Sequence, residues 1–426
     1  MSREMKDSRI EWVEQIPASW NVTRGKFLFQ NFKDVVGARV EDFERLALTL
    51  NGVIKRSKED NEGLQPAEFS SYQILRENEL VFKLIDLQNI STSRVGLSPY
   101  TGIVSPAYIV LKAGKEINPH YAEYYYLMMW MRAIFNQLGD AGVRSSLNVG
   151  ELLEISLPLP PLSEQHRIAD FLDSKCSQID AISKRIQEEI DTLEEYKKSV
   201  ISEAVTKGLD PNVEMKDSGI EWIGEIPENW SLNRVANVFS ERNEPGEDGL
   251  PFLSVSINSG ISDKELSEEE TSRQFIRADA KKNKKVYPGD IVYNMMRAWQ
   301  GAIGAVRTKG MVSAAYVTAK PIQTIDTRYF EYLLRTPTAI QEMNKYSYGI
   351  MDFRKRLYWP YFKNISLCIP PLDEQITIAD YADEITQTTD SFISSKKKQL
   401  SVLEEYKKSL IYEYVTGKKE VPGADA

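Results

Sequence analysis

The sequence predicts a mixed α/β (α+β) protein with a pseudo-two-fold tandem repeat, in which two long antiparallel helices form a coiled coil between two globular segments. Three observations support this fold class. Sequence blocks recur at one fixed offset, and an apolar stripe with helical spacing ends each repeat. The segments between the blocks combine strand-like and helix-like patterns.

The repeat is visible in three pairs of blocks, each pair separated by 210 residues. In the first pair, ten of sixteen positions are identical. The paired blocks are residues 5–20 with 215–230, 160–171 with 370–381, and 193–200 with 403–410. Because all three pairs share one offset, the chain is a tandem duplication.

Two segments of equal length, insert 1 (residues 21–156) and insert 2 (residues 231–366), lie between the repeated blocks and share only scattered anchors. The patterns predict strands at 250–258 and 290–297, and helices at 119–138 and 326–345. The aromatic residues clustered in the predicted helices are expected to pack in a core. A constant frame that holds two different inserts suggests one task performed twice on two different ligands.

A long helix is predicted after each Pro-Pro pair, with Ser163 or Asp373 as N-cap and Gly208 or Gly417 as the stop signal. Each helix would span about 45 residues, or about 65 Å, too long to bury its stripe against one small domain. The two helices are therefore expected to pack on each other. The residues chosen for this packing are Ile179, Ile182, Ile186, Leu193, Ile385, Phe392 and Leu403.

An antiparallel pair is favoured because a parallel one would need residues 208–230 to return along the helices fully extended, at about 3.3 Å per residue. The inserts would then lie at opposite ends of the helix pair. The resulting partition is 1–156 (insert 1 with its leading block), 157–208 (first helix), 209–366 (insert 2 with its leading block) and 367–426 (second helix and tail).

Composition limits the class of protein. The 426 residues carry 53 Lys+Arg and 62 Asp+Glu, a formal net charge of −9. No segment approaches the roughly 18 apolar residues of a membrane span, and the N-terminus lacks the pattern of a secretory signal. With two cysteines and two histidines, a disulfide framework and a Cys- or His-based metal site are not expected, and a reducing cytoplasm is favoured.

Local charge differs sharply from the net charge, which at face value argues against nucleic acid. Residues 271–363 carry 17 basic and six acidic residues, so this part of insert 2 has a net charge of +11. Cations mixed with aromatic and amide side chains suit a DNA surface. The candidates in insert 2 are Lys281, Lys282, Lys284, Lys285, Arg297, Trp299, Gln300, Arg354, Lys355 and Arg356. Insert 1 offers a weaker set, Lys55, Arg56, Lys58, Lys83, Arg94 and Arg144.

Catalytic motifs are not found. The chain contains no Walker A pattern, no Gly-rich cofactor loop after a strand and no Asn/Asp-Pro-Pro-aromatic segment. Asp210, Glu214 and Lys216 have a nuclease-like order, but their spacing is too tight and they lie in a linker. We therefore expect no catalytic residue and no metal site in this chain.

The repeated motifs I-E-W-x-x-x-I-P-x-x-W, P-P-L-x-E-Q-x-x-I-A-D and L-x-E-Y-K-K-S resemble those of the specificity (S) subunit of Type I restriction–modification systems. The resemblance covers essentially the whole chain. The segment from Asn294 to Gly304, N-M-M-R-A-W-Q-G-A-I-G, also resembles a recurrent segment of that family's variable domains. Insert 1 departs from this pattern at the corresponding place, which begins at Lys83.

The resemblance implies that each insert is a target recognition domain that reads one half of a bipartite double-stranded DNA site. It implies that the helices fix the spacer between the halves, and that the frame docks two methyltransferase (M) subunits and, with them, restriction/translocase (R) subunits. S-adenosylmethionine, ATP and Mg²⁺ would be used by those partners, with no cofactor bound by this chain. The main alternative is a coiled-coil protein-interaction scaffold without a DNA role, and a nuclease or methyltransferase is a distant third.

Overall fold

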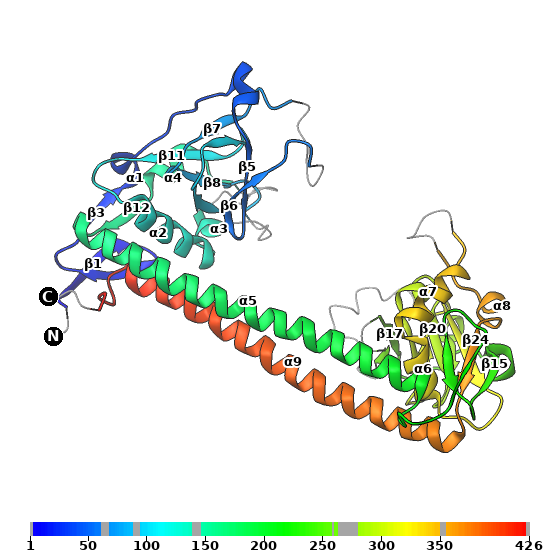
Figure 1. Cartoon of the computed structure of the whole chain (residues 1–426). Helices are drawn as coiled ribbons and strands as arrows, with labels where there is room; N and C mark the ends of the chain where they lie inside the picture. Colours follow the sequence, from blue (N-terminus) through cyan, green and yellow to red (C-terminus); the bar gives the residue numbers. More distant parts are fainter. Residues whose placement is uncertain are drawn as a thin grey trace. The chain divides into compact units, whose positions relative to one another are not determined.

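The two predicted stripes form the long helices α5 (Leu162–Lys207) and α9 (Leu372–Val415) in the computed structural model (Figure 1). Helix α5 begins one residue before the predicted N-cap. The Pro161 carbonyl accepts hydrogen bonds from the backbone N–H groups of Glu164 and Gln165 at 2.8 and 3.0 Å, so Ser163 already lies within the first turn. Gly208, with φ of +79°, directly follows α5, as expected of a left-handed residue at a helix end.

The structure describes residues 3–60, 68–87, 94–138, 146–257, 260–262, 280–349 and 355–422. Within these ranges, no helix is both long and apolar enough to cross a membrane. The chain divides into two units, unit 1 (residues 1–186 and 398–426) and unit 2 (residues 187–397). Each unit contains one insert, its leading block, and parts of both long helices.

The elements of unit 1 are short strands and helices around part of α5 and part of α9. They are β1 (Met5–Ile10), β2 (Val13–Pro17), β3 (Asn21–Arg24), α1 (Gly25–Leu28), β4 (Phe29–Gln30), η1 (Gly37–Asp42), β5 (Arg45–Thr49), β6 (Gly52–Arg56), β7 (Gln73–Leu75), β8 (Leu80–Phe82), β9 (Val95–Leu97), β10 (Gly102–Val104), β11 (Ile109–Ala113), α2 (Pro119–Met131), α3 (Ile134–Leu138), α4 (Val149–Glu154) and β12 (Ser156–Leu159).

Unit 1 has two four-stranded sheets, ordered β6-β5-β10-β7 and β4-β11-β8-β9, and helix α2 packs against β9. The clustered aromatic residues of α2 belong to the core, as expected, because Tyr121, Tyr125 and Tyr126 are fully buried. The leading block forms the β1–β2 hairpin, and insert 1 then begins with β3, which pairs with β12 directly before α5. The start and the end of insert 1 are thereby joined at the beginning of the long helix.

Unit 2 repeats this order. Its elements are β13 (Met215–Asp217), β14 (Glu225–Pro227), β15 (Ser231–Arg234), η2 (Val235–Asn237), β16 (Phe239–Glu241), β17 (Ser254–Ser256), β18 (Gly260–Ser262), η4 (Ala280–Lys282), β19 (Lys284–Val286), β20 (Ile291–Asn294), η5 (Ala298–Gln300), β21 (Ile303–Ala305), β22 (Gly310–Val312), β23 (Tyr316–Pro321), α6 (Thr327–Leu334), α7 (Pro337–Lys345), α8 (Trp359–Phe362) and β24 (Ser366–Ile369). Its main sheet has the order β16-β23-β20-β21, and β15 pairs with β24 before α9.

The predicted mixed fold with two antiparallel helices is confirmed within each unit. In unit 1, the rings of Phe171 and Tyr414 lie 4.5 Å apart, and Asp180 pairs with Lys407 at 2.6 Å. In unit 2, Glu189 pairs with Lys396 at 2.6 Å, and Lys197 pairs with Asp390 at 2.5 Å. As residue numbers rise along α5, those of its partners on α9 fall, so the two helices run in opposite directions (Figure 1).

Burial along the helices differs from the predicted stripe at two positions. Ile179 and Ile186 are buried, and Leu193, Ile385 and Leu403 are partly buried. Ile182 and Phe392 instead face solvent, with 47% and 57% of their surface exposed. Ile393, only 6% exposed, is buried in place of Phe392. A fixed seven-residue pattern drifts around a helix of 3.6 residues per turn, so adjacent apolar residues cannot be ranked from spacing alone.

Candidate nucleic-acid interface

The loop after β20 carries the polar side chains that were predicted in the centre of insert 2. β20 pairs with both β21 and β23, which fixes the place where the loop starts. The Asn294 N–H donates to the Ala302 carbonyl at 3.0 Å, and the Ala302 N–H donates to the Arg297 carbonyl at 3.1 Å. Gly301 closes the loop with φ of +90°, a conformation that suits glycine. Arg297 and Gln300 are exposed on this loop.

A second segment of insert 2 lies against this loop. The Leu357 N–H donates to the Met295 carbonyl at 2.8 Å. The Lys355 ammonium lies 5.7 Å from the centre of the Trp299 ring, within the range of a cation–π contact, and donates to the Asn344 amide oxygen at 3.0 Å. The predicted residues of these two segments are therefore brought together by the fold. Arg356 is exposed beside them, whereas Arg354 lies outside the described residues.

Of the predicted lysines on η4 and β19, Lys284 approaches the end of β20 where the Arg297 loop begins. The Lys284 ammonium donates to the Tyr316 carbonyl at 2.9 Å, and Tyr316 pairs with Asn294, the last residue of β20. Burial lowers the pKa of Lys284. Lys285 instead pairs with Glu247 at 2.9 Å, and this carboxylate raises the pKa of the lysine. Two further lysines of the predicted set are exposed on η4, Lys281 and Lys282.

We call the surface formed by exposed Arg297, Gln300 and Arg356 together with half-buried Trp299 and Lys355 the domain 2 face. It combines three cations with an aromatic ring and an amide on two segments joined by a backbone hydrogen bond. Arginine and glutamine side chains can form paired hydrogen bonds with base edges, and lysine neutralises phosphate. This arrangement is suited to bind a duplex and to distinguish its bases.

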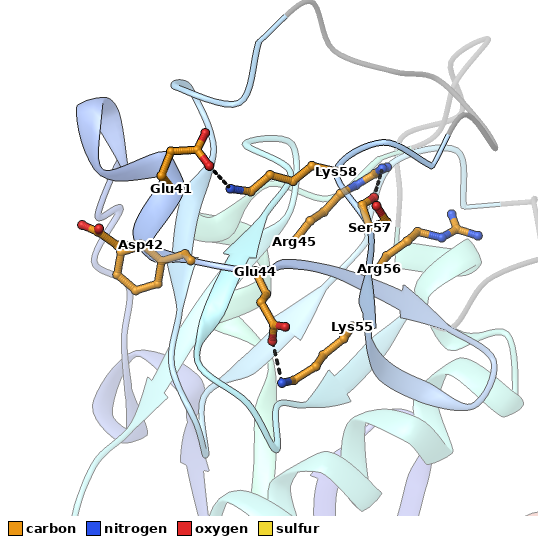
Figure 2. A pocket seen from close by; sticks show the side chains of 9 residues that line it. Glu41, Asp42, Glu44, Arg45, Lys55, Arg56, Ser57 and Lys58 are labelled. Carbon is orange, nitrogen blue, oxygen red and sulfur yellow. Dashed lines mark hydrogen bonds and ion pairs between the residues drawn. The ribbon is translucent and has the colours of Figure 1, made fainter.

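The predicted cations of β6 in insert 1 are paired with acidic residues. Figure 2 shows Lys55 beside Glu44 and Lys58 beside Glu41 around a pocket on insert 1. The Lys55 pair is 2.5 Å long and the Lys58 pair 3.2 Å, so these four side chains contribute no net charge. Arg56 also pairs with an acid, Asp60, at 3.0 Å. A phosphate would have to compete with these carboxylates for the cations.

Arg94, another candidate of insert 1, is buried rather than exposed on a basic surface. Arg94 is only 1% exposed, and its guanidinium donates to the carbonyls of Asp86 and Leu87 at 2.9 and 3.0 Å. The expectation that Arg94 contacts DNA conflicts with this burial, because its guanidinium is used to hold its own loop. Burial and the nearby Arg94 lower the pKa of Lys83. Arg144 lies outside the described residues.

The glutamine of each P-P-L-x-E-Q motif has a structural role that sequence reasoning missed. The Gln165 side chain accepts from the Asn118 N–H at 2.7 Å and donates to the Pro160 carbonyl at 2.9 Å. Gln375 repeats this arrangement, accepting from the Asp326 N–H at 3.0 Å and donating to the Pro370 carbonyl at 2.8 Å. Each glutamine therefore ties the start of a long helix to the first turn of the insert helix. Its recurrence in both copies was the available signal.

A buried tyrosine joins each insert to the end of a long helix. The Tyr121 hydroxyl lies 3.0 Å from the carbonyls of both Pro158 and Val415. The Tyr329 hydroxyl lies 3.1 Å from the Cys368 carbonyl and 2.9 Å from the Val205 carbonyl. In unit 1 the helix end belongs to α9, and in unit 2 it belongs to α5, so each insert is held by residues from both repeats.

The described residues contain no group of three or more His, Cys, Asp or Glu side chains arranged to hold a metal ion. The linker residues Asp210 and Lys216, which belong to the nuclease-like order, make local structural contacts. The Asp210 carboxylate accepts from the Asn212 N–H at 2.9 Å, and the Lys216 ammonium donates to the Glu228 carbonyl at 2.5 Å. These contacts fold the linker locally.

Comparisons with known proteins agree with this geometry. A family profile described as "Type I restriction modification DNA specificity domain" matches residues 51–192 and 223–402. The chain is similar to the MjaVIII specificity subunit of a type I restriction enzyme from Methanocaldococcus jannaschii, with 26% identity over 438 residues, 92% of this chain and 96% of the relative. It is also similar to the EcoBI specificity subunit from Escherichia coli, with 27% identity over 266 residues, 56% of this chain and 53% of the relative.

A solved structure from work on complex assembly and conformational transition of the type I R-M system has a TM-score of 0.67 to this chain. The match covers 95% of this chain and 99% of that chain at 14% sequence identity. Identity this low shows a shared fold, and the match extends over both inserts and both long helices.

Proposed function

Because the chain belongs to the Type I restriction modification DNA specificity family, we propose that each insert reads one half of a bipartite double-stranded DNA target. The inserts are then recognition domain 1 (insert 1) and recognition domain 2 (insert 2). The observation that carries this proposal is the domain 2 face, where exposed Arg297 and Gln300 share a loop with Trp299, and Trp299 contacts Lys355 of the second segment. Such side chains can contact bases and phosphates together.

We propose further that the chain has no catalytic site and acts as an adaptor. Helices α5 and α9 would fix the unspecified spacer between the two half-sites, and the repeated frame would dock two methyltransferase subunits and, with them, restriction subunits. S-adenosylmethionine, ATP and Mg²⁺ would be bound by these partners rather than by this chain, and the complex would work in the cytoplasm. The duplication of the frame supports two equivalent docking surfaces.

The alternative of a scaffold without a DNA role is not supported, because the matched family is defined by DNA specificity. The local charge of insert 2 also argues against it. A surface for protein partners alone would not need a net charge of +11 over residues 271–363.

The proposal is tested by DNA binding of the chain assembled with its methyltransferase subunits. Affinity for a target duplex and for scrambled duplexes is measured by fluorescence anisotropy at several salt concentrations. We expect tighter binding to the target, and an affinity that falls steeply with salt because phosphate contacts release counterions. Equal affinity for all duplexes would reject the proposal.

Two variants test the domain 2 face. We expect Arg297→Ala to weaken target binding by about 10- to 100-fold and to relax selectivity at one base pair, the range for loss of a bidentate base contact. Arg234→Ala is the matched control, because Arg234 is an exposed arginine on β15 of the same unit and outside the domain 2 face. If both variants bind as the parent chain does, the domain 2 face is not the reading surface.

A further inference from the structure

The loop after β8 in recognition domain 1 occupies the same place in the fold as the Arg297 loop of recognition domain 2. β8 pairs with β9 and β11 as β20 pairs with β21 and β23. The matching registers make Leu80 equivalent to Ile291 and Phe82 equivalent to Tyr293. Asp86 follows Phe82 by the same number of residues as Arg297 follows Tyr293, so Asp86 occupies the position of Arg297.

Backbone hydrogen bonds on both sides of the loops support this equivalence. In domain 1, the Lys83 N–H donates to the Arg94 carbonyl at 3.1 Å, and the Leu147 N–H donates to the Leu84 carbonyl at 2.9 Å. In domain 2, the equivalent N–H groups are those of Asn294 and Leu357, with distances of 3.0 and 2.8 Å. The same two bonds therefore frame both loops, and the position of Arg297 is occupied by an acid in domain 1.

The backbone at Asp86 is held in an unusual conformation. Its φ is +54°, in the left-handed region that side chains other than glycine adopt rarely. The buried guanidinium of Arg94 binds the carbonyls of Asp86 and Leu87 from inside the domain. The side chains of Ile85 and Asp86 are exposed. Such local strain is retained when surrounding contacts support it, and it is concentrated at functional sites.

A carboxylate placed on a DNA-reading loop has a narrow chemical use. It accepts hydrogen bonds but donates none, and it is repelled by phosphates and by the acceptor edges of guanine and thymine. The donors that it can meet in the major groove are the exocyclic amino groups of cytosine and adenine. An arginine at the same position favours guanine, because guanine presents two acceptors.

Resting on the proposed function, we propose that Asp86 is a specificity-determining residue of recognition domain 1, which accepts a hydrogen bond from a base amino group in the major groove. Arg94 is a positioning residue that holds the Asp86 backbone toward DNA. The two recognition domains thus use one structural loop with opposite side-chain chemistry. The ion-paired cations around the pocket of Figure 2 are not needed for this base contact.

The test uses the full chain assembled with its methyltransferase subunits. The bipartite target of the parent complex is first defined by methylation sequencing. Binding is then measured on duplexes that carry each of the four base pairs at every specified position. We expect Asp86→Gly, which removes the acceptor, to lose about tenfold of the discrimination at one position of one half-site. Asp86→Asn keeps one acceptor oxygen and adds an NH₂ donor group, so we expect it to shift the preference at that position toward adenine. Both substitutes tolerate positive φ, so neither should disturb the loop.

The base at that position identifies the donor, since cytosine and adenine duplexes are separate arms of the experiment. Glu77→Gln is the matched control, because Glu77 is an exposed carboxylate in the turn before β8, at the opposite end of the same strand. Arg94→Met keeps the aliphatic stem but removes the Nη2 donor that holds the carbonyls of Asp86 and Leu87. We expect it to lose selectivity at the same position as the Asp86 variants, and to leave the other half-site unchanged.

Two outcomes would overturn the inference: unchanged discrimination in both Asp86 variants, or an effect on the half-site that Arg297→Ala also alters. These outcomes are distinct from failure of the proposed function. If the parent complex binds all duplexes equally, the proposed function fails. If it reads a bipartite target and Asp86→Gly reads it equally well, only the present inference fails.

Discussion

Replacing Tyr121 by Phe should loosen the end of α9 in unit 1. The hydroxyl is fully buried and lies 3.0 Å from both the Pro158 and the Val415 carbonyl. Pro158 keeps its pairing with β3, but Val415 is the last residue of α9, where carbonyls lack intrahelical donors. Loss of one neutral hydrogen bond together with a buried, unpaired carbonyl costs about 2 kcal/mol.

Hydrogen exchange measures this cost locally. A loss of about 2 kcal/mol corresponds to exchange about 30-fold faster for the amides of residues 410–417, if opening of the helix end precedes exchange. Mass spectrometry of the intact chain can follow these residues separately from unit 2. Tyr406→Phe is the control, because Tyr406 lies on the same helix and is 55% exposed. Unchanged protection of residues 410–417 in Tyr121→Phe would refute the argument that this hydroxyl fastens the helix end.

Three further predictions concern burial. Ile393→Ala should lower the free energy of unfolding by about 2 kcal/mol in urea, whereas Phe392→Ala should change it by about 0.5 kcal/mol or less, because Ile393 is 6% and Phe392 57% exposed. Burial raises the pKa of Glu123, so the folded state favours the protonated carboxyl group. The free energy of unfolding should therefore fall as pH rises from about 4.5 through the raised pKa, and Glu123→Gln should remove that part of the pH dependence. Burial raises the pKa of both Cys176 and Cys368 to about 11, so alkylation at about pH 8 should be slow until the chain is unfolded by urea.

The repeat and the long helices could be predicted because their signals are local and occur twice. The two Pro-Pro pairs, the apolar stripes and Gly208 locate α5 and α9 within a few residues of their observed bounds. The antiparallel direction of the two helices also follows from the length of the segment 208–230 that links them. The order of strands in the sheets could not be predicted, since it depends on pairing between segments far apart in sequence, such as β8 with β9 and β11.

The candidate site was predictable only where the charged or polar side chains of the sequence are exposed in the structure. Arg297 and Gln300 are exposed, as a polar loop after a strand suggests. Arg94 is equally polar in sequence, yet it is buried against the carbonyls of its own loop. Lys55 is paired with Glu44, which lies two residues before Leu46, the strand partner of Lys55 in the β5–β6 hairpin. The sequence places Asp86 opposite Arg297 in the segment that begins at Lys83, but only the strand register shows that the two loops share one place in the fold.

Methylation sequencing of a host that carries this chain and its methyltransferase partner tests the central claim most directly. We expect one bipartite motif with two specified halves and an unspecified spacer of fixed length. When residues 231–366 are exchanged for the insert of another family member, one half should change while the other half and the spacer persist. A contiguous motif, or a change in both halves, would contradict the claim that the two inserts read DNA independently.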